Sequence, residues 1–300
     1  MSKYLVTGGA GFIGSHLVDR LVADNHEVIV VDNLLLGKRE FVNHKATLHE
    51  IDIRDYEKMR PLFKDIDGVF HLAADPRLPV SIEDPISTHA INVTGTLNVL
   101  LAAKESGVKK IVFSSSCAVY GEQPLPIKED FTPQPLSPYG LHKLMGEEYC
   151  RLFYKLYNLK SACLRYFNVF GPRKLATGSY PMVIPVFMSQ KQKGEPMTVV
   201  GTGEQTRDYV YVSDVVEANI KALDSLVEDG QAINIGSGKR TSVNEIADLI
   251  GGVRTELPDR PGEMKDIEAD NTLARELLGW EPTITLEEGI AELKKEWGIV

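Results

Sequence analysis

The first half of the chain alternates short apolar runs with stretches of helical pattern. The apolar runs are rich in β-branched residues and almost continuously hydrophobic, which is typical of parallel strands covered on both faces. Helical patterns lie between them, as at 12–24 and 88–106. This alternation predicts a doubly wound α/β fold with a parallel sheet. The predicted strands are 4–7, 27–31, 47–53, 68–72, 110–114 and 161–166.

The regular alternation breaks after residue 168. Glycine and proline accumulate between Gly171 and Gly203, and these residues favour loops over regular elements. The runs 207–223 and 232–236 are expected to return to the main sheet, whereas 237–300 is expected to be helical and rich in loops. The pattern therefore predicts a large domain of residues 1–168 and 207–236. It also predicts a smaller mixed C-terminal lobe of residues 169–206 and 237–300.

Composition and charge narrow the function classes. The 300 residues are 43% hydrophobic and 25% charged, and no apolar run approaches the roughly 18 residues that span a membrane. The net charge of −9 argues against nucleic acid or an anionic membrane as a partner. The N-terminus enters a strand pattern directly, so no secretory leader is expected. Because Cys117, Cys150 and Cys163 lack metal-like spacing, we expect a cytoplasmic protein with reduced thiols and no metal site.

A glycine-rich turn follows the first predicted strand. Gly8, Gly11 and Gly14 have the spacing GxxGxxG at the start of a helical pattern. Glycines in this place let the backbone approach a pyrophosphate, which binds at the N-terminus of the helix. The next strand ends at Asp32, and a carboxylate there bonds the ribose hydroxyls and repels a 2′-phosphate. The sequence therefore predicts a bound dinucleotide, NAD in preference to NADP.

Further candidates for cofactor contact lie at the carboxyl ends of the other strands. Asp52 and Ile53 would border the adenine, and the small residues at 72–74 would leave room for the cofactor backbone. Asn92, on the following helix, is placed to reach a backbone carbonyl of the sheet. Packing alone would account equally well for each of these. The predicted cofactor contacts are Gly8, Gly11, Phe12, Ile13, Gly14, Asp32, Asn33, Asp52, Ile53, Leu72, Ala73, Ala74, Asn92, Ser114, Tyr139, Lys143 and Tyr166.

Tyr139 and Lys143 form a candidate acid–base pair. Ser137 suits a helix N-cap and Pro138 suits the first helical position, so a helix is predicted to begin there. Residues four apart share one face of that helix, and a nearby positive charge lowers the pKa of a phenol. Upstream, three consecutive serines end the fifth strand, and Ser116 is expected to emerge at its carboxyl end. The pattern predicts a poised tyrosine base beside a serine hydroxyl.

These motifs together resemble the extended short-chain dehydrogenase/reductase superfamily over nearly the whole chain. Within it, the sequence is most similar to NAD-dependent nucleotide-sugar epimerases, the UDP-galactose 4-epimerases and their N-acetylhexosamine relatives. The resemblance implies a Rossmann sheet and a retained NAD that takes hydride from sugar C4 and returns it to the other face. It assigns Ser116 to the sugar 4-hydroxyl, Tyr139 to removal of its proton and Lys143 to the nicotinamide ribose.

The same resemblance implies a UDP-sugar substrate. The run RYFNVFGP (165–172) matches the motif in which Asn168 contacts the diphosphate region, and Arg207 and Arg260 match the arginines that bind the UDP phosphates. Where the family has Tyr for glucose and galactose, or Cys or Ser to admit an N-acetyl group, this chain has Ile267. The expected substrates are UDP-glucose and UDP-galactose, with the N-acetylated pair as the alternative. The predicted substrate contacts are Arg77, Ser116, Asn168, Val183, Thr198, Val200, Arg207, Arg260 and Ile267.

The resemblance also implies a homodimer formed through helices 88–106 and 138–157.

The resemblance argues against other activities of the same fold. A 4,6-dehydratase needs two carboxyl groups, Asp and Glu, directly after the serine, where this chain has Cys117 and Ala118. UDP-glucuronate decarboxylases carry the same Glu, so Ala118 argues against them as well. UDP-glucuronate 4-epimerases often have Thr in place of Asn168. A non-catalytic NAD-sensing regulator would typically lose Tyr139 or Lys143, and both are present.

Overall fold

A parallel sheet of seven strands forms the centre of the computed structural model, which describes residues 1–176, 182–258 and 266–299. The strand order is β10-β6-β5-β4-β1-β2-β3, so the chain starts near the middle and winds outward in both directions. This arrangement confirms the predicted doubly wound α/β fold. The strands are β1 (Lys3–Thr7), β2 (Glu27–Asp32), β3 (Thr47–Glu50), β4 (Gly68–His71), β5 (Lys110–Ser116), β6 (Lys160–Tyr166) and β10 (Asp229–Ile235).

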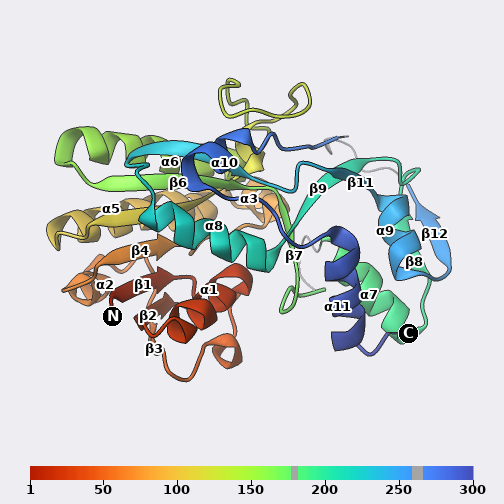
Figure 1. Ribbon diagram of the computed structural model, residues 1–300, viewed down its shortest axis with the longest axis horizontal. Helices are drawn as coiled ribbons and strands as arrows, with labels where there is room; N and C mark the ends of the chain where they lie inside the picture. Colours follow the sequence, from red (N-terminus) through yellow and green to blue (C-terminus); the bar gives the residue numbers. More distant parts are fainter. Residues whose placement is uncertain (177–181, 259–265, 300) are drawn as a thin grey trace.

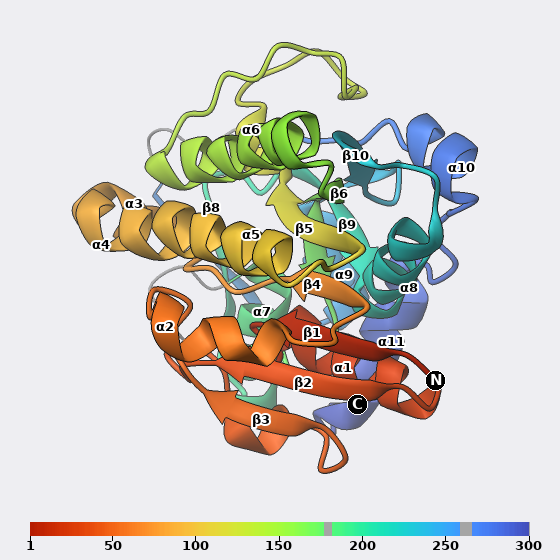
Figure 2. The same cartoon turned by 90° about the vertical axis from the view of Figure 1, so that its left-hand side faces the viewer.

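Helices cover both faces of this sheet (Figure 1, Figure 2). On one face α1 (Phe12–Ala23) packs against α8 (Val212–Asp224), and on the other α5 (Gly95–Glu105) packs against α6 (Pro138–Tyr157). Alternate residues of one strand enter different cores, as Val30 does on the α1 side and Ile29 on the α5 side. This two-sided burial explains why the strands are apolar along their whole length.

The predicted helices are present near their expected positions. The stretch 88–106 corresponds to α4 (Pro85–His89), a π-helical turn η3 (Ala90–Thr94) and α5 in succession. At the start of α6 the Ser137 Oγ accepts a hydrogen bond from Gly140 N at 3.1 Å, and Pro138 occupies the first turn. The shorter helical elements are α2 (Tyr56–Met59), α3 (Leu78–Glu83), η1 (Arg39–Phe41), η2 (Arg60–Phe63) and η4 (Cys117–Val119).

Two small sheets lie beside the main sheet, at the right in Figure 1. Helices α7 (Val183–Lys193), α9 (Val243–Ile250) and α11 (Leu286–Glu296) pack around them, whereas α10 (Thr272–Leu278) packs against β10 and α8. One sheet has the order β11-β9-β7, and the other pairs β12 with β8. Their strands are β7 (Asn168–Phe170), β8 (Met197–Val200), β9 (Thr206–Tyr211), β11 (Arg240–Ser242) and β12 (Arg254–Leu257).

Several strand predictions are wrong. The start of 207–223 was expected in the main sheet, but β9 pairs with β7 and β11, because β10 already occupies the edge beside β6. The strand predicted at 47–53 ends at Glu50, where the chain turns. The strand predicted at 110–114 continues to Ser116, because Ser115 and Ser116 still pair with β6.

Among the described residues, no helix has the length and apolar character needed to cross a bilayer.

Candidate active site

A cavity of about 900 Å³ opens at the carboxyl ends of β1, β2, β4 and β5. This is the edge of an open parallel sheet at which ligands bind, because the adjoining helices begin there. Its wall contains most of the predicted site residues. Of the predicted cofactor contacts it includes Gly8, Gly11, Phe12, Ile13, Gly14, Asp32, Asn33, Asp52, Ile53, Leu72, Ala73, Ala74, Ser114, Tyr139, Lys143 and Tyr166, and of the predicted substrate contacts Arg77, Ser116, Asn168, Arg207 and Ile267.

The glycine-rich turn forms one end of the cavity. Gly8 has a φ of +74°, and a Cβ on it would lie 2.7 Å from Ala73 N. A Cβ on Gly14 would lie 2.1 Å from Gly8 O, so larger residues cannot replace either glycine without moving the backbone. Gly11 is the N-cap of α1 and provides no side-chain cap. The first N–H groups of α1 therefore remain available to an anion, which is the chemistry that a dinucleotide pyrophosphate requires.

Asp32 lies at the end of β2 beside this turn. Its side chain is 7% exposed and accepts hydrogen bonds from Ala10 N at 3.0 Å and Leu34 N at 2.8 Å. Burial raises the pKa of the Asp32 carboxyl, while the two backbone hydrogen bonds oppose that shift. The two main-chain contacts fix the carboxylate at the cavity wall. Together with the glycine turn, the residues present fit NAD.

The three serines that end β5 have different partners. Ser115 Oγ donates to Glu147 Oε1 at 2.6 Å, so its hydroxyl is engaged away from the reaction. The main-chain oxygen of Ser114 accepts from Lys143 Nζ at 2.6 Å. Ser116 Oγ accepts from Ala118 N at 3.1 Å, and the Ser116 hydroxyl acts on Tyr139 to lower its pKa against the larger effect of burial. Ser116 is therefore the serine that the fold places beside the tyrosine.

Tyr139 and Lys143 lie on one face of α6, with Lys143 Nζ 5.9 Å from the centre of the Tyr139 ring. Burial lowers the pKa of Lys143 to about 8. Burial also raises the pKa of Tyr139 to about 12, while Ser116 acts in the opposite direction. In the chain by itself, desolvation of the phenolate therefore dominates the tyrosine. A lowering of its pKa by Lys143, together with the positive charge of a bound nicotinamide, stays a prediction for the loaded enzyme.

The model of the NAD dependent epimerase/dehydratase family matches residues 4–236 of the chain. The chain belongs to this family. It is 46% identical over 295 residues, 95% of each chain, to a protein of Methanocaldococcus jannaschii. It is 39% identical over 308 aligned positions, 97% of this chain and 96% of the relative, to the UDP-glucose 4-epimerase of Mycolicibacterium smegmatis.

Two solved structures of epimerases superpose closely on the chain. The UDP-glucose 4-epimerase of Thermotoga maritima, solved with UDP-glucose, has a TM-score of 0.94 and 39% identity, with 99% of this chain and 98% of that chain covered. The UDP-N-acetylglucosamine 4-epimerase of Methanobrevibacter ruminantium, solved with UDP-N-acetylmuramic acid, has a TM-score of 0.92 and 36% identity, with 98% and 99% covered. The family match and the similarity to these epimerases together confirm the predicted fold, the prediction of an NAD-dependent epimerase, and NAD as the cofactor.

Some predicted contacts of this epimerase lie away from the cavity. Thr198 Oγ1 accepts from Gln190 Nε2 at 2.9 Å, between β8 and α7. Val183 and Val200 are likewise absent from the described cavity wall. These three positions lie on α7 and β8, in the smaller part of the fold, and only Met182, just before α7, reaches the cavity wall among their immediate chain neighbours. Arg260 lies outside the described residues.

Asn92 has a positioning contact in place of a cavity contact. Its Nδ2 donates to Asp75 O at 2.9 Å, and its Oδ1 accepts from Asp75 N at 2.7 Å. It therefore reaches a backbone carbonyl, but in the loop after β4 and not in the sheet. The Asn92 amide fixes that loop from behind.

Sequence reasoning missed the ion pair that this loop presents. The Asp75 carboxylate is 2% exposed and accepts from Arg77 Nε at 2.9 Å and Nη2 at 2.6 Å. Arg77 lines the same cavity as Tyr139, so the ion pair lies at that wall. The run ADPR places Asp and Arg two residues apart, and that spacing was the available signal.

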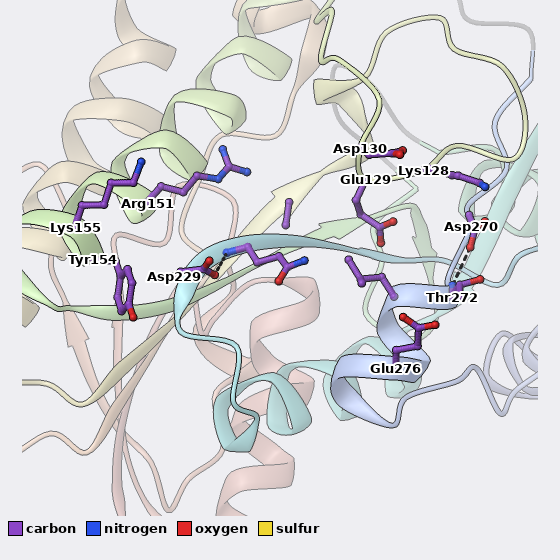
Figure 3. A pocket seen from close by; sticks show the side chains of 13 residues that line it. Lys128, Glu129, Asp130, Arg151, Tyr154, Lys155, Asp229, Asp270, Thr272 and Glu276 are labelled. Atoms are coloured by element: carbon purple, nitrogen blue, oxygen red, sulfur yellow. Dashed lines mark hydrogen bonds between the residues drawn. The ribbon is translucent and has the colours of Figure 1, made fainter.

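A second cavity, of about 800 Å³, lies at the edge strand β10 between α6 and α10 (Figure 3). Both carboxylates and cations line its wall. Asp229 and Asp270 accept hydrogen bonds from main-chain N–H groups two residues further on, at 3.2 Å and 2.9 Å. None of the predicted site residues lines this cavity. The first cavity is therefore the candidate active site of the epimerase.

Proposed function

We propose that the protein is a UDP-hexose 4-epimerase that interconverts UDP-glucose and UDP-galactose through a 4-keto intermediate. The observation that carries the proposal is the meeting of Ser116, Tyr139 and Lys143 at one cavity wall beside the glycine turn. From there the cavity continues to Asn168, Arg207 and Ile267, the positions assigned to the nucleotide-sugar. The names of the similar epimerases support the same substrate class.

The residues of the chain have separable roles in this proposal. Tyr139 removes the proton of the sugar 4-hydroxyl and later returns it, and Ser116 hydrogen-bonds the same oxygen. Lys143 Nζ donates a hydrogen bond to Ser114 O. In this position Lys143 holds the nicotinamide ribose and lowers the pKa of the Tyr139 phenol. Bound NAD supplies a hydride acceptor and a positively charged ring, and such a charge favours the phenolate. The chain's contribution is a desolvated base with its partner already positioned.

The residues that follow Ser116 support inversion over elimination. Dehydration would need carboxyl groups at both positions 117 and 118, and the decarboxylases carry a Glu at the second of them, whereas this chain has Cys117 and Ala118. Burial raises the pKa of the Cys117 thiol to about 12. A neutral thiol and a methyl group cannot transfer the protons that those reactions require.

Replacing Ser116 with Ala is expected to lower kcat roughly 10- to 100-fold, the loss of one hydrogen bond to a developing charge. NAD content should not change, because the hydroxyl contacts the sugar and not the cofactor. The ratio of NAD to protein, measured after denaturation of the purified variant, checks this together with kcat. Ser115→Ala is the matched control and should keep its kcat, although its lost bond to Glu147 lowers stability. Release of NAD from the Ser116 variant would contradict the assigned role.

The wall at Ile267 provides the test of sugar specificity. Ile267 is 4% exposed and packs with Val119, Tyr120 and Phe167, so a Tyr in its place must project into the cavity. Ile267→Tyr is expected to lower kcat/KM for UDP-N-acetylgalactosamine roughly 10-fold or more relative to UDP-galactose, because crowding at one group costs about 1–3 kcal/mol. Coupled assays on both substrates, run side by side, measure the ratio. Ile267→Leu conserves volume and should leave the ratio nearly unchanged.

The coupled assays also decide between the two substrate pairs, and an absorbance measurement decides between an enzyme and a regulator. Turnover of the N-acetylated sugar at a rate equal to or above that of UDP-galactose would favour the UDP-N-acetylglucosamine 4-epimerase alternative. Absence of turnover on both would contradict the proposed activity. Transient NADH-like absorbance on addition of UDP-galactose distinguishes a catalyst from an NAD-sensing regulator, which would bind without reducing its cofactor.

We further infer a homodimer formed through α5 and α6. Leu141, Leu152 and Leu156 lie along one side of α6 and are 41%, 44% and 60% exposed. An apolar stripe of this kind is typical of a surface that another chain covers, and the family resemblance assigns these helices to the subunit contact. Sedimentation velocity measures the oligomeric state directly, and a monomer at micromolar protein concentration would contradict the inference.

A further inference from the structure

The segment of residues 171–175, here called the strap, follows β7 and lies against α1. His16 Nε2 donates to Pro172 O at 3.0 Å, and Arg173 Nη2 donates to Asp19 Oδ2 at 2.7 Å. Both partners are on α1, which begins at the glycine turn. Arg173, Lys174 and Leu175 also line the large cavity. The strap therefore joins the edge of the small sheets to the helix whose N-terminus faces the cofactor.

Two features of Arg173 mark the strap as a site built for a ligand. Its φ is +63°, a left-handed conformation that costs a non-glycine residue energy. Its Nη1 is buried and has no hydrogen-bond partner among the described residues. The guanidinium lies over the Phe41 ring, 5.9 Å from the ring centre. The described residues therefore supply no acceptor for this N–H donor, and a bound anion would supply one.

Lys174 is the second cation of the strap. Its Nζ lies 4.9 Å from the centre of the Phe12 ring, and no carboxylate of the described residues pairs with it. Burial lowers the pKa of Lys174 to about 8, so the protein bears a cost for keeping this ammonium charged. An anion bound beside it would remove that cost. Phe12 is the first residue of α1, where the helix dipole favours the same sign of charge.

We propose that Lys174 binds the pyrophosphate of NAD together with the N–H groups of α1, and that the strap slows release of the cofactor. Arg173 adds a donor to the same anion. The contacts of both cations favour the cofactor over the substrate diphosphate. Phe12 and Phe41 lie at the glycine turn and after β2, whereas Asn168 and Arg207 lie on β7 and β9. The inference needs only the NAD cofactor of the family and does not depend on which sugar is the substrate.

Release of NAD from the holoenzyme tests the proposal. Protein loaded with labelled NAD is diluted into excess unlabelled NAD, and the rate of loss is followed without any sugar present. Lys174→Met should release NAD roughly 10- to 100-fold faster, the loss expected for one charge-assisted contact. Its release rate should also depend less steeply on salt. Lys174→Arg should stay within about threefold of the wild type, because it keeps the charge and the donors.

A control variant and a second ligand show whether faster NAD release comes from a lost contact at the cofactor, from the loss of any positive charge, or from a change at the substrate site. Lys239→Met removes the same charge from an exposed position outside the cavity and should leave NAD release unchanged. Titration of UDP into the holoenzyme reports on the substrate diphosphate, and its affinity should not change in Lys174→Met. Unchanged NAD release, or a loss confined to UDP binding, would overturn the proposal. Lys174→Gln provides the same readout should the Met variant fail to fold.

Discussion

Replacing Tyr139 with Phe is expected to lower kcat roughly 10²- to 10⁴-fold, the range for loss of a general base, with NAD still bound. The aromatic ring stays in place, so the packing of residue 139 at the cavity wall is preserved. Only the hydroxyl that Ser116 contacts is removed. Coupled assay of UDP-galactose epimerisation, with NAD content measured on the same sample, checks both parts of the expectation.

The pH profile adds a second signature to this variant. The pKa of Tyr139 is raised to about 12 in the chain alone by burial, so at neutral pH the phenol is protonated unless a bound positive charge stabilises the phenolate. The base is the deprotonated form, and wild-type kcat should therefore rise with pH along its acidic limb. The residual activity of Tyr139→Phe should lack that limb.

Tyr149→Phe serves as the control for the same chemical change on the same helix. Tyr149 lies outside the described cavity wall, so its variant should keep both the rate and the pH profile. Equal losses in the two variants would show that the hydroxyl of Tyr139 has no special role. An unaltered pH profile in Tyr139→Phe would likewise remove it as the titrating base.

The second large effect concerns stability. Glu147 is 0% exposed and accepts from Arg165 Nε at 2.8 Å, Arg165 Nη2 at 2.7 Å and Ser115 Oγ at 2.6 Å. Arg165 is 2% exposed and lies over the Tyr120 ring. Glu147→Gln leaves that guanidinium buried without a counter-charge. The free energy of unfolding is expected to fall by about 3–5 kcal/mol, measured by urea denaturation.

The neighbouring glutamate provides a matched control for Glu147. Glu148 is on the same helix, has a side chain 62% exposed and pairs with Arg151 at the surface. Glu148→Gln should therefore change stability by less than about 1 kcal/mol. Removing both charges in Glu147→Gln with Arg165→Met should recover part of the loss, because no charge remains buried alone. If Glu147→Gln and Glu148→Gln lowered the free energy of unfolding equally, the buried ion pair of Glu147 would contribute no more to stability than the exposed pair of Glu148.

This pair links the elements that carry the catalytic residues. Glu147 is on α6 with Tyr139 and Lys143, Ser115 is on β5 beside Ser116, and Arg165 is on β6. The three hydrogen bonds cross-link these elements beneath the cavity. The serine assigned to chemistry, Ser116, and the serine that bonds Glu147, Ser115, are therefore adjacent in sequence but have different partners.

The sequence by itself determined the features that depend on local spacing. The glycine turn and Asp32 follow strands whose apolar runs can be recognised directly, and the four-residue spacing of Tyr139 and Lys143 places them on one helix face. Parallel strands present their carboxyl ends at one edge of a sheet. The gathering of these motifs at one cavity could therefore be predicted before any coordinates.

Only the tertiary structure decided the features that depend on contacts between distant segments. The place of β9 follows from which edge strand is already paired, and the pKa of Tyr139 follows from the depth to which the fold buries it. The contact of Asn92 with Asp75, and the approach of Lys174 to Phe12, join residues whose relation has no periodic signal. Burial and long-range pairing arise from the packed chain as a whole, and for that reason spacing in the sequence could not reveal them.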